Sequence, residues 1–325
     1  MKRRRIAIAL SVLAMVSAFA GSASSQTYPS QQIRIIVPVA AGGLTDLIAR
    51  IAADYITTRT GQTAIVDNRT GGAGMIGVGA VVRSQPDGYT LAMVINGDIV
   101  ISPYLFKSMP FDPLTDLRPV ALLAEAPQLM VVNSSVPAKT LGELIAYAKA
   151  NPGKLNYAST GIGSSAHLGA YLFTNLAGVS ITHVPYRGAA PAVNDLVAGH
   201  VQMMHLSLGP VAGQVAAGTL RVLAVAMEHR WDALPNVPTS KEAGLPGYLG
   251  TAWFGMFAPK GTPDEVIERL NGLMRDMTAD PKISARFKEA FVDPTTKSVA
   301  EFQRQIVEEA PKWQRMIRET GATAE

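Results

Sequence analysis

The chain has 325 residues, contains no cysteine, and carries 29 Lys and Arg residues against 25 Asp and Glu residues. A chain without cysteine has no disulfide, no thiolate nucleophile and no lipid-modified N-terminal cysteine, so its stability depends on burial of an apolar core. About 300 residues suffice for two such domains.

The first 25 residues have the features of a secretory signal. Met1–Arg5 is basic, Ile6–Ala20 is largely apolar, and Ala18-Phe19-Ala20 fits a small-residue cleavage site. We expect cleavage after about residue 20–25 and a periplasmic protein, with an uncleaved N-terminal anchor as the alternative. Cleavage removes four basic residues and leaves 25 basic against 25 acidic. A mature chain without net charge has no general positive field for nucleic acid.

Apolar runs and helical patterns alternate along the rest of the chain. In the first third we expect alternating strands and helices at Ile33–Pro38, Leu44–Thr60, Thr63–Val66, Gly74–Arg83 and Thr90–Ile95. The middle continues with Leu129–Val132, Leu141–Ala150, Leu155–Ala158, Ser164–Leu176, Val201–His205, Val211–Ala217 and Leu220–Ala226. Amphipathic helices follow at Thr262–Met277 and Ser298–Arg318. This alternation predicts an α/β architecture of parallel sheets covered by helices, in which ligands bind outside the carboxyl ends of strands.

The first strand leads into the first helix through the sequence VPVAAGGLTD, residues 37–46. Two alanines and two glycines leave this backbone bare, which lets a ligand approach its N–H groups without the help of a cationic side chain. We expect Thr45 to be the N-cap and Asp46 to stabilise the helix start without contacting the ligand. The N–H groups of Gly42–Thr45 are the predicted contacts for an anion.

A second glycine-rich stretch follows the next strand. Gly72-x-Gly74-x-x-Gly77 has the spacing of a dinucleotide-binding fingerprint, and Asp98 lies near the end of the following strand. An exported NAD-type oxidoreductase is therefore the alternative function. The polar Asp67-Asn68-Arg69, which separates strand and glycines, and export away from the nicotinamide pool both weigh against it.

The third loop, Tyr157–His167, also follows a strand and opens a helix. Its serines and threonine offer hydroxyl and N–H groups together, so we expect it to be a second anion cradle. Gly161-x-Gly163-x-x-Ala166 in the same stretch also has the spacing of a dinucleotide-binding fingerprint, but no acidic residue lies about twenty positions further on. His167 is expected to form local hydrogen bonds and not to catalyse a reaction.

Catalytic and metal sites find little support in the sequence. Ser207 follows a strand like a nucleophile elbow, but His205 replaces the first glycine of that motif, and only the neighbours Glu228 and His229 could complete a triad. We therefore expect Ser207 to be a turn or pocket residue, and a serine hydrolase is the least favoured alternative. The five histidines show no metal-ligand spacing, so no metal and no cofactor are expected.

Taken together, nine short segments resemble the Bug/TctC family, the periplasmic solute receptors of tripartite tricarboxylate transporters. These segments are Tyr28–Ser30, Val37–Asp46, Val66–Gly71, Gln85–Thr90, Pro152–Tyr157, Thr182–Gly188, Leu234–Thr239, Glu242–Tyr248 and Trp253–Gly255.

The resemblance implies the fold of a type II periplasmic binding protein, with two doubly wound α/β lobes and a ligand cleft between them. Residues 26–125 plus 251–325 would form domain 1, and residues 126–250 domain 2. It also implies a non-enzymatic, monomeric receptor for a small carboxylate, either a dicarboxylate or a more apolar acid. This receptor would pass its ligand to membrane permease subunits or to a sensor.

The expected ligand-binding residues lie mainly in the first and third loops. They are Ala41, Gly42, Gly43, Leu44, Thr45, Asn68, Asn96, Ser159, Thr160, Gly163, Ser164, Ser165, His167 and His205. The chain departs from the family pattern at Leu44, Met75 and Leu206, where the family often has polar residues. We interpret these departures as signs of a less polar pocket and a more apolar acid.

Overall fold

The computed structural model describes residues 28–324, so the predicted signal at residues 1–25 lies outside the described residues. Residues Gln31–Glu325 form one compact unit. Within the described chain, no helix combines the length and the apolarity that a membrane crossing requires.

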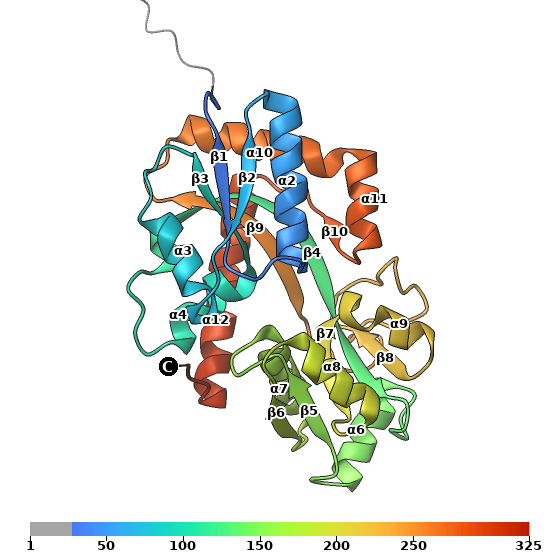
Figure 1. Ribbon diagram of the computed structural model, residues 1–325. Helices are drawn as coiled ribbons and strands as arrows, with labels where there is room; N and C mark the ends of the chain where they lie inside the picture. The colour runs from blue at the N-terminus through green and yellow to red at the C-terminus, as the bar shows by residue number, and fades with distance from the viewer. Residues whose placement is uncertain (1–27, 325) are drawn as a thin grey trace, which may run out of the picture. The chain divides into compact units, whose positions relative to one another are not determined.

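The first lobe is built on one part of the sheet, in the order β2-β1-β3-β9-β4 (Figure 1). Its strands are β1 (Ile33–Val37), β2 (Ala64–Asn68), β3 (Thr90–Ile95), β9 (Thr251–Pro259), the first part of β4 (Leu117–Asn133) and the short β10 (Asp293–Pro294). β1, β2 and β3 are parallel, whereas β9 runs antiparallel to both β3 and β4. The sheet is therefore mixed, because the strand that returns from the second lobe inserts in the opposite direction.

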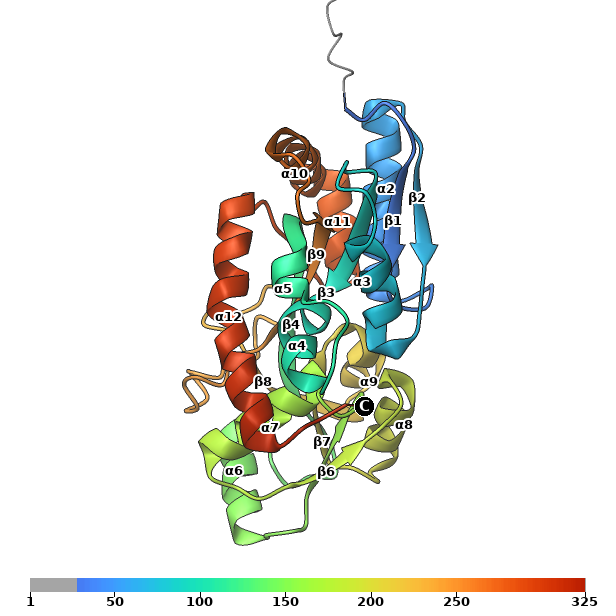
Figure 2. The ribbon, with the colours of Figure 1, turned by 90° about the vertical axis from the view of Figure 1, so that its left-hand side faces the viewer.

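Helices cover both faces of this sheet. The longer ones are α2 (Leu44–Thr60), α3 (Met75–Val82), α10 (Asp264–Ala279), α11 (Pro281–Glu289) and α12 (Val299–Thr320). α2 and α10 contact each other on one face, while α3 and α12 share an apolar core on the other. Helix α12 also reaches α7 of the second lobe (Figure 2). Short helical segments connect β3 to β4 at Gly97–Ile101, α4 (Ser102–Leu105) and α5 (Pro113–Asp116).

The second lobe uses the rest of the sheet, in which β4 pairs with both β7 and β8 and the order continues to β5 and β6. Its remaining strands are β5 (Asn156–Ser159), β6 (Thr182–Pro185), β7 (Met203–Ser207) and β8 (Leu220–Val225). Its helices are α6 (Leu141–Ala150), α7 (Ser165–Ala177), α8 (Ala189–Ala198) and α9 (Ala212–Ala216). Along β4, Leu129 and Val131 belong to one core cluster, and Met130 and Val132 to another. Both faces of this strand are thus buried, which explains its continuous apolar run.

Strand β4 connects the two lobes. Its first part, up to Pro127, pairs with β9, and from Gln128 onward it pairs with β7 and β8. The predicted strand covered only Leu129–Val132, because Glu125, Pro127 and Gln128 interrupt the apolar pattern further upstream. The structure corrects its start to Leu117. The prediction of two α/β lobes is confirmed.

Several other elements were absent from the prediction. β6, α8, β9, α11 and the short helices of Gly97–Asp116 were not predicted. Pro191 lies in the first turn of α8, where the missing N–H of proline is tolerated. β9 has no alternation because eight of its nine residues are buried.

Candidate functional site

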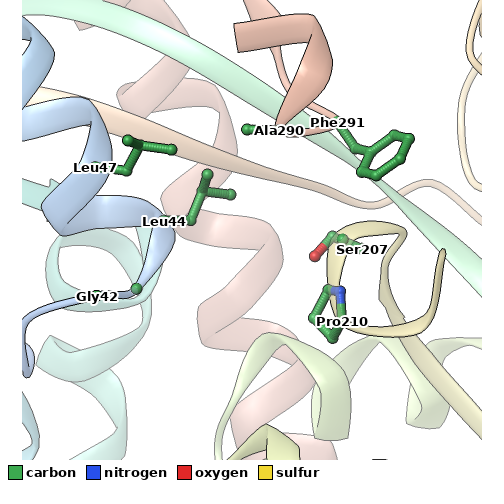
Figure 3. A pocket seen from close by; sticks show the side chains of 9 residues that line it. Gly42, Leu44, Leu47, Ser207, Pro210, Ala290 and Phe291 are labelled. Carbon is green, nitrogen blue, oxygen red and sulfur yellow. The ribbon is translucent and has the colours of Figure 1, made fainter. Parts of the chain in front are cut away.

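A cavity of about 360 Å³ lies where three segments from distant parts of the sequence meet (Figure 3). The segments are the start of α2, the turn after β7 and the end of α11. The residues that line the cavity are Gly42, Gly43, Leu44, Leu47, Ser207, Gly209, Pro210, Ala290 and Phe291.

The start of α2 has no side-chain cap. Gly43 is the N-cap residue, its backbone is extended (φ −82°, ψ 173°), and no side chain accepts a hydrogen bond from the first N–H groups of the helix. The first helical bond runs from the Leu47 N–H to the Gly43 carbonyl at 3.0 Å. The N–H groups of Leu44, Thr45 and Asp46 therefore have no partner among the described residues. Unpaired donors at the positive end of a helix dipole stabilise an anion.

The prediction of Thr45 as N-cap was wrong. Thr45 is the second residue of α2, and its side chain is buried. The capping position falls on Gly43, which has no side chain to offer. As a result, the helix start is more open than the sequence suggested.

A carboxylate behind the loop holds its shape. Asp46 accepts a hydrogen bond from the Gly42 N–H at 2.9 Å, two from Arg50 at 3.0 Å, and one from the Asn68 amide at 3.0 Å. Asn68 also donates to the Val39 carbonyl at 3.1 Å. Burial opposes ionisation of Asp46, but these hydrogen bonds, led by that of Arg50, lower its pKa below the usual 3.8. The interpretation of Asp46 as a stabilising residue is confirmed, and the Gly42 N–H and the Asn68 amide are committed to the loop itself.

The opposite wall comes from the turn after β7. Ser207 supplies the only polar side chain among the residues that line the cavity, and its hydroxyl lies on the side facing Leu44 (Figure 3). The interpretation of Ser207 as a pocket residue is confirmed. Two residues earlier, the His205 ring is buried and its Nδ1 lies 2.6 Å from the Tyr248 hydroxyl. Burial lowers the pKa of His205 to about 3.

The third segment, Ala290–Phe291, follows α11 and had no place in the predicted site. Phe291 has φ +57°, a left-handed conformation that is unusual for a bulky residue. Its ring packs against a core cluster of the second lobe. This side chain therefore joins the C-terminal part of the first lobe to the second lobe at the cavity.

Several polar groups of the third loop are paired within the loop. Ser164 is the N-cap of α7 and accepts from the His167 N–H at 3.2 Å, while its hydroxyl donates to the Gly161 carbonyl at 2.7 Å. The Gly163 N–H donates to His167 Nδ1 at 3.0 Å. Ser159 Oγ lies 2.7 Å from Nε2 of His183, whose ring stacks on His167 with centroids 4.0 Å apart. Burial, followed by the nearby His183, lowers the pKa of His167 to about 4. The expectation that His167 forms local hydrogen bonds is confirmed.

Of the expected ligand-binding residues, only Gly42, Gly43 and Leu44 line the cavity. The others lie in the supporting shell of the first loop, in the third loop, or in the interior. They are Ala41, Thr45, Asn68, Asn96, Ser159, Thr160, Gly163, Ser164, Ser165, His167 and His205. Gly163 packs against the Leu105 side chain of α4.

Asn96 lies at the end of β3 and is fully buried. Its amide donates to the Thr251 carbonyl at 3.2 Å and to Glu309 at 3.3 Å, so it joins β3, β9 and α12. Its position indicates support of β9, the strand that returns from the second lobe.

The glycines of the apparent fingerprint have packing roles. A Cβ on Gly74 would lie 2.6 Å from Oδ1 of Asp98, and one on Gly77 would lie 2.8 Å from the Arg69 carbonyl and 2.9 Å from Cα of Pro38. Burial raises the pKa of Asp98 to about 7, opposed by a hydrogen bond from the Ile95 N–H. At Gly74 and Gly77 a side chain would collide with residues that follow β1 and β3. Close packing of this turn therefore explains the glycines at these two positions of the fingerprint.

Residues missed by the sequence analysis include Leu47, Gly209, Pro210, Ala290 and Phe291. Leu47 belongs to α2 and is apolar like the buried residues of that helix, yet it is 37% exposed and lines the cavity. The others belong to connections that have no periodic pattern. No group of three or more metal-ligating side chains forms a metal site in the described part of the chain.

Residues 48–322 match the family model of the tripartite tricarboxylate transporter family receptor. The protein BugT of Bordetella pertussis is 33% identical over 323 residues, which is 99% of each chain. A UPF0065 protein from the tcbD-tcbE intergenic region of a Pseudomonas species is 36% identical over 316 residues, 97% of this chain and 94% of the relative.

Solved structures of similar chains have the same fold. Rpa4515 of R. palustris with adipate is 34% identical, with a TM-score of 0.81 over 91% of this chain and 99% of that one. MatC of Rhodopseudomonas palustris with bound malate is 30% identical, with a TM-score of 0.76 over 89% of this chain and 100% of that one. The periplasmic binding protein BugD is 32% identical, with a TM-score of 0.77 over 92% and 100%.

Proposed function

Because the chain belongs to the tripartite tricarboxylate transporter receptor family, we propose that it binds the carboxylate of a small organic acid at the start of α2. The family and the similar structures are solute-binding receptors, and they give no support to an oxidoreductase or a serine hydrolase. Adipate and malate in two of those structures support a carboxylate ligand here.

One observation carries the proposal. The unpaired N–H groups at the start of α2 belong to a segment that borders a cavity of ligand size. Charge-assisted hydrogen bonds from such donors contribute about 1.5–3 kcal/mol each, so no cationic side chain is required. Arg50 does not compete for the ligand, because Asp46 already binds its guanidinium.

The two lobes supply the conformational change. We take residues 26–125 plus 251–325 and residues 126–250 as the moving units, joined through β4 and β9. A ligand that contacts both α2 and the turn after β7 favours the closed state. The third loop, Ser159–Ser165, would approach the ligand on closure, and the Ser165 N–H at the start of α7 would then act from the opposite side.

The cellular role follows from the family. We propose an exported monomer whose N-terminal segment is a cleaved signal and which acts in the periplasm. Its partners would be the membrane permease subunits of a tripartite transporter, or a sensor that reads the closed form.

Native mass spectrometry of the purified protein tests this proposal, together with a thermal-shift screen of mono-, di- and tricarboxylates. We expect a retained small acid, or a rise in melting temperature with at least one carboxylate. NAD should give no shift, and ester substrates should show no turnover. A shift with NAD alone, or ester turnover lost in Ser207→Ala, would replace the proposal with one of the enzymatic alternatives.

A further inference from the structure

The cavity has two chemically different sides. Its polar side is the backbone of the α2 start, where Gly43 and Leu44 expose the main chain. The rest of its lining is mostly apolar side chains, which come from α2 on one side of the cavity and from the turn after β7 and the end of α11 on the other (Figure 3). We call these side chains the apolar wall, which comprises Leu44, Leu47, Pro210, Ala290 and Phe291.

No charged side chain lines the cavity, and Ser207 provides one hydroxyl. A carboxylate at the α2 start has backbone donors, but a second carboxylate directed at the apolar wall would find one donor at most. An ionised group buried without hydrogen bonds is strongly disfavoured, whereas methylene or aryl groups gain from removal of their surface from water.

Phe291 is the most unusual member of the wall. Its φ of +57° is a conformation that glycine adopts without strain and that a bulky side chain adopts at a cost. Hydrogen bonds on both sides fix this turn, from the Phe291 N–H to the Lys288 carbonyl at 2.9 Å and from the Val292 N–H to the Phe287 carbonyl at 3.1 Å. The chain thus retains an aromatic ring at the cavity although glycine would suit the backbone better.

We propose that this apolar wall, with Phe291 as its specificity-determining residue, selects acids that carry one carboxylate and an apolar remainder. The inference rests on the proposed carboxylate site and specifies its ligand class. Of the three departures first taken as signs of an apolar acid, only Leu44 lines the cavity. Met75 packs against the core of the first lobe, and Leu206 is buried in the second.

Hexanoate and adipate form a matched pair of probes, because both have six carbons and differ only at the end opposite the shared carboxylate. Isothermal titration calorimetry should show hexanoate binding at least ~10-fold more tightly than adipate. Phenylacetate and succinate extend the comparison to an aromatic monoacid and a shorter diacid.

Phe291→Gly removes the ring and relieves the backbone strain. We expect hexanoate affinity to fall ~10-fold and adipate affinity to change less than ~3-fold. The melting temperature should change little, because the relief of backbone strain opposes the loss of ring packing against the core of the second lobe. Val307→Ala is the matched control, since it removes an apolar side chain that is 61% exposed and outside the cavity. Leu47→Gln in the same assay provides a second, independent change to the wall.

The outcomes separate the two proposals. If adipate binds more tightly than hexanoate, or if Phe291→Gly and Leu47→Gln weaken both acids equally, the apolar wall does not select the ligand, while the carboxylate receptor stands. If none of the four acids binds and the broader carboxylate screen shows no shift, the proposed function fails and the inference fails with it.

Discussion

The starts of α2 and α7 look alike in the sequence and differ in the structure. Each follows a strand through a glycine-containing loop, and both were predicted to be anion cradles. At α2 the N-cap is Gly43, and the N–H groups of the next three residues have no partner among the described residues; the first of them, Leu44, lines the cavity. At α7 the Ser164 side chain caps the helix, and His167 accepts the Gly163 N–H.

The difference indicates that a helix start is more open to a ligand when no side chain of the loop takes up its first donors. Side-chain caps and ligands compete for the same first N–H groups, because only those groups lack an intrahelical acceptor. The α2 loop is instead stabilised from behind, through Asp46, Arg50 and Asn68. That arrangement keeps the loop fixed and its outward N–H groups free.

The largest expected effect comes from Gly43→Val at the open start. Gly43 has negative φ, and a Cβ there would have as its only neighbour the Ala40 carbonyl, at 3.9 Å, so the fold tolerates a side chain. The new side chain would nevertheless occupy the approach to the Leu44 N–H. We expect carboxylate affinity to fall ~100-fold, measured by calorimetry with whichever acid the screen identifies.

Gly142→Val is the control for this change, because Gly142 lies in α6 and a Cβ there has no neighbour within 4 Å. It should leave both affinity and melting temperature near the parent values. Unchanged binding by Gly43→Val would show that the ligand lies elsewhere and would remove the contrast between the two helix starts.

Acid should act on the α7 start through His167. Its pKa is about 4 in the folded protein because the ring is buried next to His183, against about 6.5 in the unfolded chain. The unfolded state therefore takes up a proton first, and stability falls as pH decreases from about 6.5 to about 4. The loss from this one group should reach ~2 kcal/mol at pH 5.

Chemical denaturation of the parent and of His167→Asn, at pH 7 and pH 5, measures this contribution. Asparagine cannot titrate, but its side-chain oxygen can accept the Gly163 N–H. The variant should lose less stability between the two pH values than the parent. Equal losses would show that folding does not lower the pKa of His167.

The smallest expected effects concern the hydroxyls of the α7 start. Ser164→Ala removes the cap and should lower the free energy of unfolding by ~1 kcal/mol. Ser165→Ala removes no hydrogen bond found among residues 28–324 and should leave stability unchanged. The double variant should bind its acid several-fold more weakly, because closure of the third loop over the ligand would lose its hydroxyl contacts. Full affinity in the double variant would exclude these hydroxyls from ligand closure.

The sequence determined the local features of this protein. The strand–helix alternation predicted the α/β lobes, and the bare VPVAAGGLTD loop predicted an exposed helix start with Asp46 in a supporting role. Such features depend on residues close together in the chain, whose backbone preferences and helix periodicity can be read directly. The predicted start of α2 at Leu44 is confirmed for this reason.

The tertiary structure decided which of the loops borders a cavity and what surrounds it. Leu47 and Phe291 both line the cavity although they lie far apart in the sequence, and Phe291 belongs to a turn with no periodic pattern. Whether an N–H at a helix start remains free also depends on the positions of nearby side chains. Ser164 and His167 accept such N–H groups at the start of α7, whereas no side chain does so at the start of α2. A cavity is the space that packing of distant segments leaves unfilled, so its lining is set by the folded arrangement and has no local signal in the sequence.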